Sequence, residues 1–304
     1  MSHTSLTILG CHSASPKANA HPTAQLLEMK GHLFLIDCGE GTQIRIREQK
    51  AKFSRINHIF ISHLHGDHFF GLIGLISTFG LMNRQQDLHV YGPKGIKQIV
   101  QLQLKLSQSY TKYKLHFHEL ESENTELIFE DEKLTVQTIP LNHRVYTNGF
   151  LFKEKVGERK LDFKAAQACK VNHEYFNLAK RSKNVFNREG DVVDYHKITL
   201  DPDASKSYAF CSDTAFKPDI VELIKNVDLL YHESTFLEEQ EDLCFKTKHS
   251  TAKQAGIIAQ KAKVKHLLLG HYSVRYKNLD LFKNEAEEVF SDVSLSKSGL
   301  KFNI

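Results

Sequence analysis

The sequence predicts an α/β fold in which β-sheets pack against helices. Short apolar runs rich in β-formers recur from one end of the chain to the other, and helical periodicity follows several of them. This interleaving favours sheets covered by helices over a helical bundle. With 304 residues, 41% of them hydrophobic, the chain is long enough to bury a sizeable core.

The individual elements follow from these patterns. Eight apolar runs are expected to be strands: LTILG, LFLID, HIFIS, LHVYG, LTVQTIP, SYAFCS, VDLLYHE and HLLLGH. Helical periodicity predicts helices at 41–49, 66–82, 95–107, 251–261 and 279–289. The longest apolar stretch, 69–82, is too short to span a bilayer and is expected to be a buried helix.

The cysteines and the N-terminus indicate the cellular compartment. Five cysteines are scattered along the chain without a Cys-x-x-Cys pair, which argues against a disulfide framework. The N-terminal residues lack a basic region followed by an apolar one, so no signal peptide is predicted. We therefore expect a soluble, cytoplasmic protein.

The region 154–202 differs from the rest of the chain. It is polar, shows little alternation and interrupts two strands, so we expect an insertion within a single domain spanning 1–304. Between residues 153 and 197, eleven Lys and Arg face seven Asp and Glu, an excess equal to the net charge of +4 for the whole chain. Such an excess fits either a polyanionic partner or a solvated surface, and charge alone favours the solvated surface.

Polar residues with metal-binding or catalytic potential follow several of the expected strands. The segments are LIDCGEGT, FISHLHGDH, TIPLNH, FCSDT, LLYHEST and LLLGHY. In layered α/β folds, sites are commonly assembled from loops at one set of strand ends. We therefore expect the six segments to converge on one cleft.

The segment ISHLHGDHFFGL, residues 61–72, contains the strongest metal-binding signal. His63 and His65 share a side of the extended chain, and Asp67 and His68 begin the next helix after a turn at Gly66. This arrangement can present two ligands to one ion and two to its neighbour. Imidazoles and carboxylates without thiolates suit Zn²⁺ best, with Mn²⁺ or Fe²⁺ possible. Incidental surface or core histidines are disfavoured, because four ligand-type residues fall within six positions.

Four ligands cannot complete two sites, so more distant residues are needed. His143, Asp213 and His271 each follow an expected strand, and the two oxygens of Asp213 could bridge two ions. Taken singly, each would be interpreted as a capping or satisfied polar residue. Taken with the cluster at 63–68, metal ligation is the better interpretation. Eleven further histidines lack this context and are expected to be ordinary surface or core residues.

These residues carry a family resemblance. SHLHGDH resembles the signature of the metallo-β-lactamase fold, and the ordered set DCGEGTQ, SHLHGDH, NH, SDT, HEST, HST and GH resembles ribonuclease Z. That family trims the 3′ trailer from precursor tRNA. The resemblance implies a four-layer αββα sandwich, a homodimer and a substrate-binding arm at 154–202. The sequence departs from the family in two places: the arm has few Gly and Pro residues, and the loop at 11–23 is less basic.

The resemblance also implies a zinc-dependent endoribonuclease mechanism. Metal-activated hydroxide would attack the phosphodiester and leave a tRNA 3′-hydroxyl, since two ions can clamp the attacking and leaving oxygens. One zinc would be held by His63, His65 and His143, the other by Asp67, His68 and His271, with Asp213 bridging both.

Further roles follow for residues near these ligands. Asp67 would orient the water and accept its proton. His249 would protonate the leaving oxygen while Glu233 holds its tautomer, although both could instead support the metal ligands. Asp37 is expected to orient a ligand histidine, and His232 to be structural.

Two alternatives remain open. A binuclear zinc hydrolase of a small phosphodiester or thioester would keep every metal ligand, and only the role of the arm would differ. A non-catalytic RNA-binding relative is disfavoured, because binding alone gives no reason to retain seven metal ligands.

Overall fold

The computed structural model describes residues 4–15 and 17–304, and these residues form two compact units. The larger unit contains the described residues up to Glu130 together with Leu134–Lys153 and Lys206–Ile304. The smaller unit contains Asp131–Lys133 and Glu154–Ser205. Pro16, in the loop at 11–23, lies outside the described residues.

The first sheet of the larger unit has seven strands in the order β18-β1-β2-β3-β4-β5-β6. From β3 to β6 the strands run parallel, and the remaining neighbours are antiparallel. Its strands are β1 Ser5–Gly10, β2 Ala24–Met29, β3 His32–Ile36, β4 Ile56–Phe60, β5 Leu88–Pro93, β6 Leu115–Leu120 and β18 Lys301–Asn303.

The second sheet also has seven strands, in the order β17-β16-β15-β14-β9-β8-β7. From β14 to β17 the strands are parallel, whereas β9 runs antiparallel to β14. Its strands are β7 Leu127–Glu130, β8 Leu134–Pro140, β9 Asn148–Glu154, β14 Ser207–Cys211, β15 Leu229–Glu233, β16 His266–Gly270 and β17 Val293–Leu295.

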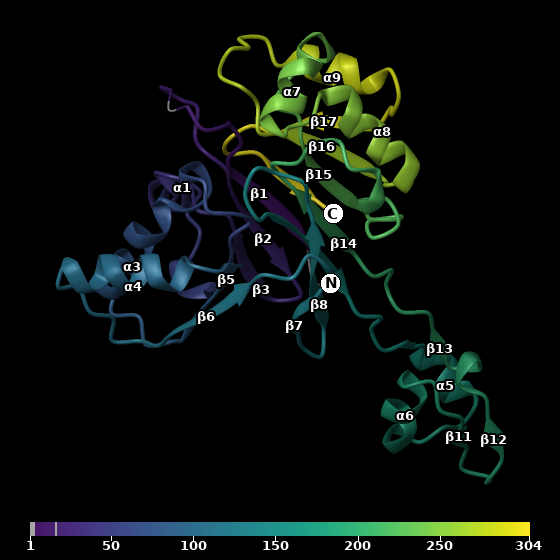
Figure 1. Ribbon diagram of the computed structural model, residues 1–304. Helices are drawn as coiled ribbons and strands as arrows, with labels where there is room; N and C mark the ends of the chain where they lie inside the picture. Colours follow the sequence, from purple (N-terminus) through teal and green to yellow (C-terminus); the bar gives the residue numbers. More distant parts are fainter. Residues whose placement is uncertain (1–3, 16) are drawn as a thin grey trace. The chain divides into compact units, whose positions relative to one another are not determined.

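Helices cover the outer face of each sheet, which gives the four layers αββα (Figure 1). On the first sheet, apolar side chains of α1, α3 and α4 pack in one buried cluster with the strands. On the second sheet, α8 and α9 join the main core, which also fills the space between the sheets. The helices of this unit are α1 Thr42–Glu48, α2 Gly66–Phe69, α3 Gly71–Leu81, α4 Ile96–Leu106, α7 Glu241–Thr247, α8 Ala252–Ala262 and α9 Asp280–Glu287.

The structure confirms the predicted α/β class and four-layer sandwich, and corrects some of the predicted elements. The helix expected at 66–82 is two helices, because the amide of Gly71 donates to the carbonyl of Cys38 (2.9 Å) instead of continuing the helical ladder. That helix is also only partly buried, since Phe70, Leu81 and Met82 are exposed. The eight predicted strands do not include β2, β6, β7, β9, β17 and β18 of this unit.

The smaller unit has its own small core beneath short elements. Two two-stranded sheets, β10-β13 and β11-β12, combine with two short helices. Its buried residues include Ala166, Val171, Ala179, Val185 and Ile198. The elements are β10 Lys160–Leu161, α5 Phe163–Ala168, α6 Phe176–Lys180, β11 Val185–Phe186, β12 Val192–Val193 and β13 Thr199–Leu200.

Membrane insertion through a helix has no structural basis in the described part of the chain. None of the helices found there combines the length and apolar character that crossing a bilayer needs.

Candidate metal centre

Strand ends of both sheets supply the candidate site. Asp37 directly follows β3, Asp213 lies two residues beyond β14, and His271 directly follows β16. All three have positive φ, of 55°, 48° and 60° respectively. Residues other than glycine seldom adopt this conformation, which costs on the order of 1–3 kcal/mol and persists where surrounding contacts hold it. Three of the thirteen non-glycine residues with positive φ in the described chain therefore lie where the polar side chains meet.

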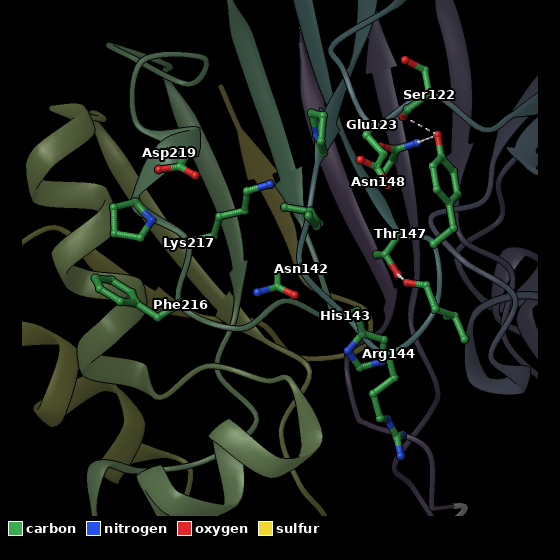
Figure 2. Close-up of a pocket in the computed structure, with 15 residues that line it drawn as sticks. Ser122, Glu123, Asn142, His143, Arg144, Thr147, Asn148, Phe216, Lys217 and Asp219 are labelled. Atoms are coloured by element: carbon green, nitrogen blue, oxygen red, sulfur yellow. Dashed lines mark hydrogen bonds between the residues drawn. The ribbon is translucent and has the colours of Figure 1, made fainter.

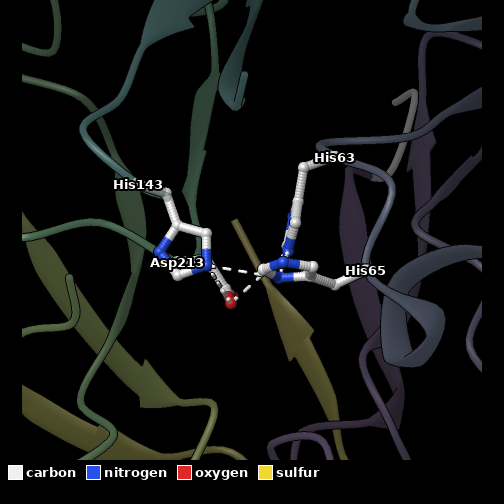
Figure 3. A group of neighbouring side chains, drawn as sticks. All are labelled: His63, His65, His143 and Asp213. Atoms are coloured by element: carbon white, nitrogen blue, oxygen red, sulfur yellow. Dashed lines mark hydrogen bonds and ion pairs between the residues drawn. The ribbon is translucent and has the colours of Figure 1, made fainter. Parts of the chain in front are cut away.

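The first group of donor atoms comes from both sheets. His63 and His65 follow β4 of the first sheet, whereas His143 and Asp213 follow β8 and β14 of the second. Figure 3 shows the four side chains pointing toward one another. One ligand atom from each lies within 4.8 Å of the others. His63 Nε2 is 3.5 Å and His143 Nε2 is 3.7 Å from the same oxygen, Asp213 Oδ2.

The second group lies around the other oxygen of Asp213. Asp67, His68 and His271 place their ligand atoms within 4.8 Å of one another. His68 Nε2 and His271 Nε2 are each 3.2 Å from Asp213 Oδ1. Asp67 Oδ2 is 3.3 Å from His68 Nε2 and 3.5 Å from His271 Nε2. Asp213 thus presents one oxygen to each group, as a carboxylate bridging two cations would.

Four of the histidines are held through Nδ1, which leaves Nε2 directed into the site. The partners of Nδ1 are Asp37 Oδ2 for His68 (2.7 Å), Ser62 Oγ for His63 (3.0 Å), the Lys248 carbonyl for His143 (2.8 Å) and Thr235 Oγ1 for His271 (2.9 Å). Such outer contacts orient metal-binding histidines and select the tautomer that binds the ion. The buried Nε2 of His68 makes no hydrogen bond, as expected of an atom suited to a metal.

Charge in the site also suits a cation. Burial lowers the pKa of His63, His65 and His143, so these imidazoles are in the neutral form that binds metal. Burial also opposes ionisation of Asp213, but the surrounding imidazoles outweigh it and hold the pKa of that carboxyl well below its usual range. For His68, burial is outweighed by the nearby carboxylates, which raise its pKa. The cluster therefore attracts positive charge, and its donor set indicates a divalent-metal site.

A cleft of about 440 Å³ gives access to the second donor group. Asp67, Asp213 and His271 line it, together with His249 and Arg144. Residues 13–15, from the loop that departs from the family pattern, lie at the same cleft. Solvent and a ligand can therefore reach donor atoms that are otherwise buried.

The chain is similar along nearly its whole length to proteins named Ribonuclease Z. The chain is 43% identical over 299 residues to the Ribonuclease Z of Bacteroides thetaiotaomicron, which covers 98% of this chain and 95% of the relative. It is 41% identical to the Ribonuclease Z of Parabacteroides distasonis, over the full length of both chains. The chain belongs to the ribonuclease Z family.

Other comparisons agree on the fold of this ribonuclease Z family member. The structure matches human tRNase Z, short form (ELAC1), with a TM-score of 0.71 and 26% identity over 98% of each chain. The metallo-β-lactamase fold protein YhfI of Bacillus subtilis, 18% identical, matches over both full chains with a TM-score of 0.70, which shows the shared fold. Residues 4–176 also match the family model described as Anti-Pycsar protein Apyc1, a range that ends before Asp213 and His271.

Glu233 and His249 form a pair next to the donor groups of this ribonuclease Z family member. His249 Nδ1 donates to Glu233 Oε1 at 2.8 Å, and the carboxylate also accepts from the amides of Thr214 and Thr235. Burial disfavours the charged imidazole, but the adjacent carboxylate outweighs it and raises the pKa of His249 to about 9. A ligand nitrogen of His249 also lies within 4.8 Å of donor atoms of Asp213 and His271.

Gly39 of the DCGEGT segment and Gly71 of α3 allow close contact with the turn that carries Asp67 and His68. A Cβ added to Gly39 would lie 2.4 Å from the Asp67 carbonyl, and one added to Gly71 would lie 2.1 Å from the Gly39 carbonyl. The amide of Cys38 donates to the His68 carbonyl at 2.7 Å. This family segment therefore acts as backbone support for Asp67 and His68, and glycine is needed because the chains touch.

Sequence reasoning located Asp37 but missed three of the groups that hold the histidines. Ser62 joins Asp37 to His63, Thr235 joins Glu233 to His271, and the Lys248 carbonyl fixes His143. Ser62 and Thr235 lie inside the segments SHLHGDH and HEST, so proximity to a ligand was a usable signal. No sequence signal marked the Lys248 carbonyl, because its contact with His143 spans 105 residues of sequence. His232, expected to be structural, is fully buried and contacts the Glu233 carbonyl.

Replacing Asp37 by asparagine is expected to lower metal affinity by about 10–100-fold, the usual cost of losing an outer contact to a metal ligand. The Asp37 carboxylate accepts from the Ser62 amide (2.7 Å), the Ser62 hydroxyl and His68 Nδ1, so an amide cannot satisfy every donor. Competition with a fluorescent chelator measures the affinity. Asp87→Asn, an exposed carboxylate bonded to His116, is the matched control. Equal affinity in the two variants would contradict the orienting role.

Proposed function

We propose that this protein is a zinc-dependent endoribonuclease that removes the 3′ trailer from precursor tRNA and leaves a tRNA 3′-hydroxyl. One observation carries the proposal: a chain of the ribonuclease Z family places seven donor side chains in two groups that share Asp213. Its relatives include proteins named Ribonuclease Z and human tRNase Z, and these names support tRNA as the substrate.

We further propose that the two groups hold two Zn²⁺ per subunit, with Mn²⁺ or Fe²⁺ as alternatives. Nitrogen and carboxylate donors without thiolates support this choice. One ion would be held by His63, His65 and His143, the other by Asp67, His68 and His271, with Asp213 shared. Bound divalent ions would lower the pKa of water and neutralise charge on the phosphodiester.

The protein's own groups would orient the reactants. Asp67 lines the cleft, where its carboxylate can position the attacking water and accept a proton. His249 lines the same cleft, and Glu233 engages its Nδ1, so the opposite nitrogen remains available to protonate the departing 3′ oxygen. Because the Glu233 carboxylate is buried and satisfied by four donors, it fixes the imidazole rather than reacting itself.

The decisive experiment incubates the metal-loaded protein with a 3′-extended precursor tRNA, with and without chelator, and maps the product ends. We expect cleavage after the mature 3′ region, loss of cleavage with chelator, and recovery on adding Zn²⁺. Hydrolysis of small phosphodiesters without cleavage of the precursor would favour the small-substrate hydrolase. Binding of the precursor without any cleavage would favour the non-catalytic relative.

We propose that residues 154–202 form an arm that contacts the body of the tRNA. In the smaller unit, several cations are already paired: Arg159 with Asp201, Lys170 with Glu189, and Arg181 with Glu158. Three further lysines of this unit are exposed and form no ion pair within it, namely Lys164, Lys183 and Lys197. Phosphate groups are the natural partners for such unpaired cations.

Replacing Lys164, Lys183 and Lys197 together by alanine is expected to weaken precursor binding. Each lost phosphate contact should also reduce the slope of log affinity against log salt concentration by about 0.7–0.9. Binding titrations at several salt concentrations measure both quantities. A second triple variant with the same change in charge, outside the arm, is the control: Lys97→Ala, Lys261→Ala and Lys277→Ala. Identical salt slopes for the two triple variants would rule out the arm as a phosphate-binding element.

We also propose a cytoplasmic homodimer. Apolar side chains on or beside α3 and α4 are exposed, including Phe70, Leu81, Leu102 and Leu106, and exposed apolar surface of this kind supports a protein contact. Five cysteines without a disulfide among them support a reducing compartment. Sedimentation of the wild type and of a Leu102→Glu variant tests the dimer, and cell fractionation tests the compartment.

A further inference from the structure

A second pocket, of about 640 Å³, lies beside the metal centre in the larger unit. Figure 2 shows its two walls, one carrying Phe216, Lys217 and Asp219, the other carrying residues of the loop between β8 and β9. His143 belongs to this lining and also to the first donor group. The pocket is therefore adjacent to the site where cleavage is proposed.

Part of the polar lining of this pocket is not engaged by other protein groups. Among the described residues, Arg144 and Lys217 take part in no ion pair, and the side-chain amide of Asn142 in no hydrogen bond. The ring of Phe216 is partly buried and packed against the main core, so it forms a fixed apolar surface. Two cations, an amide and an aromatic ring together match a nucleotide, which offers a phosphate, hydrogen-bonding edges and a flat base. The carboxylates of Glu123 and Asp219 also line the pocket and can accept hydrogen bonds from ribose hydroxyls or base amino groups.

The opposite wall is held in place by hydrogen bonds. Tyr146 donates to the Ser122 carbonyl at 2.8 Å and accepts from the Asn148 amide at 2.8 Å, as the dashed lines in Figure 2 indicate. The side chain of Lys217 extends from the first wall into the space between the two, whereas the Arg144 side chain points away from Lys217. Arg144 also lines the metal-centre cleft. One cation thus serves this pocket alone, and the other lies at the junction with the catalytic site.

A third cavity, of about 410 Å³, indicates which part of the substrate each pocket would bind. It shares Asn142 and Phe216 with the large pocket, and it is also lined by Lys248 and His249. If His249 protonates the departing 3′ oxygen, the terminal nucleoside of the tRNA must lie on the His249 side. The large pocket lacks His249 and meets the metal centre through His143 and Arg144, so we assign it to the other side of the scissile phosphate.

We propose that the large pocket binds the first nucleotide of the 3′ trailer, with its base against Phe216 and its phosphates near Lys217 and Arg144. This inference rests on the proposed function and adds a specificity-determining subsite to it. Stacking on an aromatic ring is tolerant of base identity, so trailers of any sequence are accepted, but a trailer without a base at its first position is disfavoured.

The test compares two precursor tRNAs that differ only at the first trailer position, one carrying a normal nucleotide and one an abasic ribose. For the wild type, kcat/KM is expected to be about tenfold higher for the normal nucleotide. Phe216→Ala is expected to abolish this preference, and Phe216→Tyr, which keeps the ring, to retain it. Lys217→Ala is expected to lower kcat/KM for both precursors equally, because both keep the phosphates.

Lys225→Ala is the matched control, since Lys225 is an exposed lysine paired with Glu222 and lines none of the three cavities. The subsite is overturned if the wild type cleaves both precursors equally, or if Phe216→Ala retains the tenfold preference. A Lys217→Ala variant that behaves like Lys225→Ala would also overturn it. Failure of the wild type to cleave either precursor would instead refute the proposed function, so the two failures are distinguishable.

Discussion

Replacing Asp67 by alanine is expected to lower the rate of trailer removal by about 10³-fold or more. Metal-ion catalysis contributes several kcal/mol to such a barrier, and each 1.36 kcal/mol is a factor of ten in rate. Asp67 Oδ2 lies 3.3 Å from His68 Nε2 and 3.5 Å from His271 Nε2, so the substitution removes a donor from the second group and a carboxylate that lines the cleft. Single-turnover cleavage of a 3′-extended precursor measures the loss.

The same Asp67→Ala variant is expected to bind the precursor with nearly the wild-type affinity, because the proposed phosphate contacts lie in the arm and at Lys217 and Arg144, and none involves Asp67. A filter-binding titration measures this affinity, and metal analysis reports how many ions the variant retains. Asp87→Ala, which removes an exposed carboxylate far along the first sheet from the ligands, is the matched control. Loss of binding together with loss of folding would mean that Asp67 has a structural role, and it would contradict the assignment of Asp67 as a catalytic carboxylate.

Replacing His249 by alanine is expected to lower cleavage of precursor tRNA by about 10²–10⁴-fold, the usual contribution of a positioned general acid. The imidazole lines the cleft, and Glu233 holds its Nδ1 at 2.8 Å. A phosphodiester with a p-nitrophenolate leaving group needs no protonation of that group. The loss on such a substrate is therefore expected to be less than about tenfold.

The contrast between the two substrates separates acid catalysis from metal binding. His249 also lies near Asp213 and His271, so a role as a metal ligand would reduce both activities alike. A double-mutant cycle with Glu233→Gln adds a second test, since two groups that act as a unit give strongly non-additive losses. His196→Ala, an exposed histidine hydrogen-bonded to Asp194, controls for removal of an imidazole. Additive losses, equal on both substrates, would refute the acid role.

Much of the architecture could be predicted from local patterns. Thr251 caps α8, with Thr251 and Gln254 exchanging hydrogen bonds of 3.1 Å, so the start of that helix is encoded within four residues. Two of the strands that were missed, β2 and β9, have a physical explanation. β2 is buried on both faces except at Glu28, and β9 is buried at every position but Lys153, so neither shows the alternation that marks a half-buried strand.

The donor residues were predictable because each strand end carries a ligand-type side chain directly in the sequence. The groups that orient these donor residues were harder to predict from the sequence. His143 depends on a backbone carbonyl at Lys248, which no side-chain pattern reveals. Likewise, His249 and Glu233 are sixteen residues apart, and only the fold brings their polar atoms to 2.8 Å.

The sequence by itself determined which side chains are available: the histidines and carboxylates at strand ends, the glycines beside them and the basic excess of residues 153–197. These features are local, because spacing of a few residues sets the side of a strand or the start of a helix. Only the tertiary structure decided which oxygen of Asp213 faces which histidines, and that Phe216 and Lys217 border a pocket beside His143. The Asp213 contacts join segments from two different sheets, and the Phe216 pocket joins the ends of β8 and β14 within one sheet, so both depend on how distant strands pack.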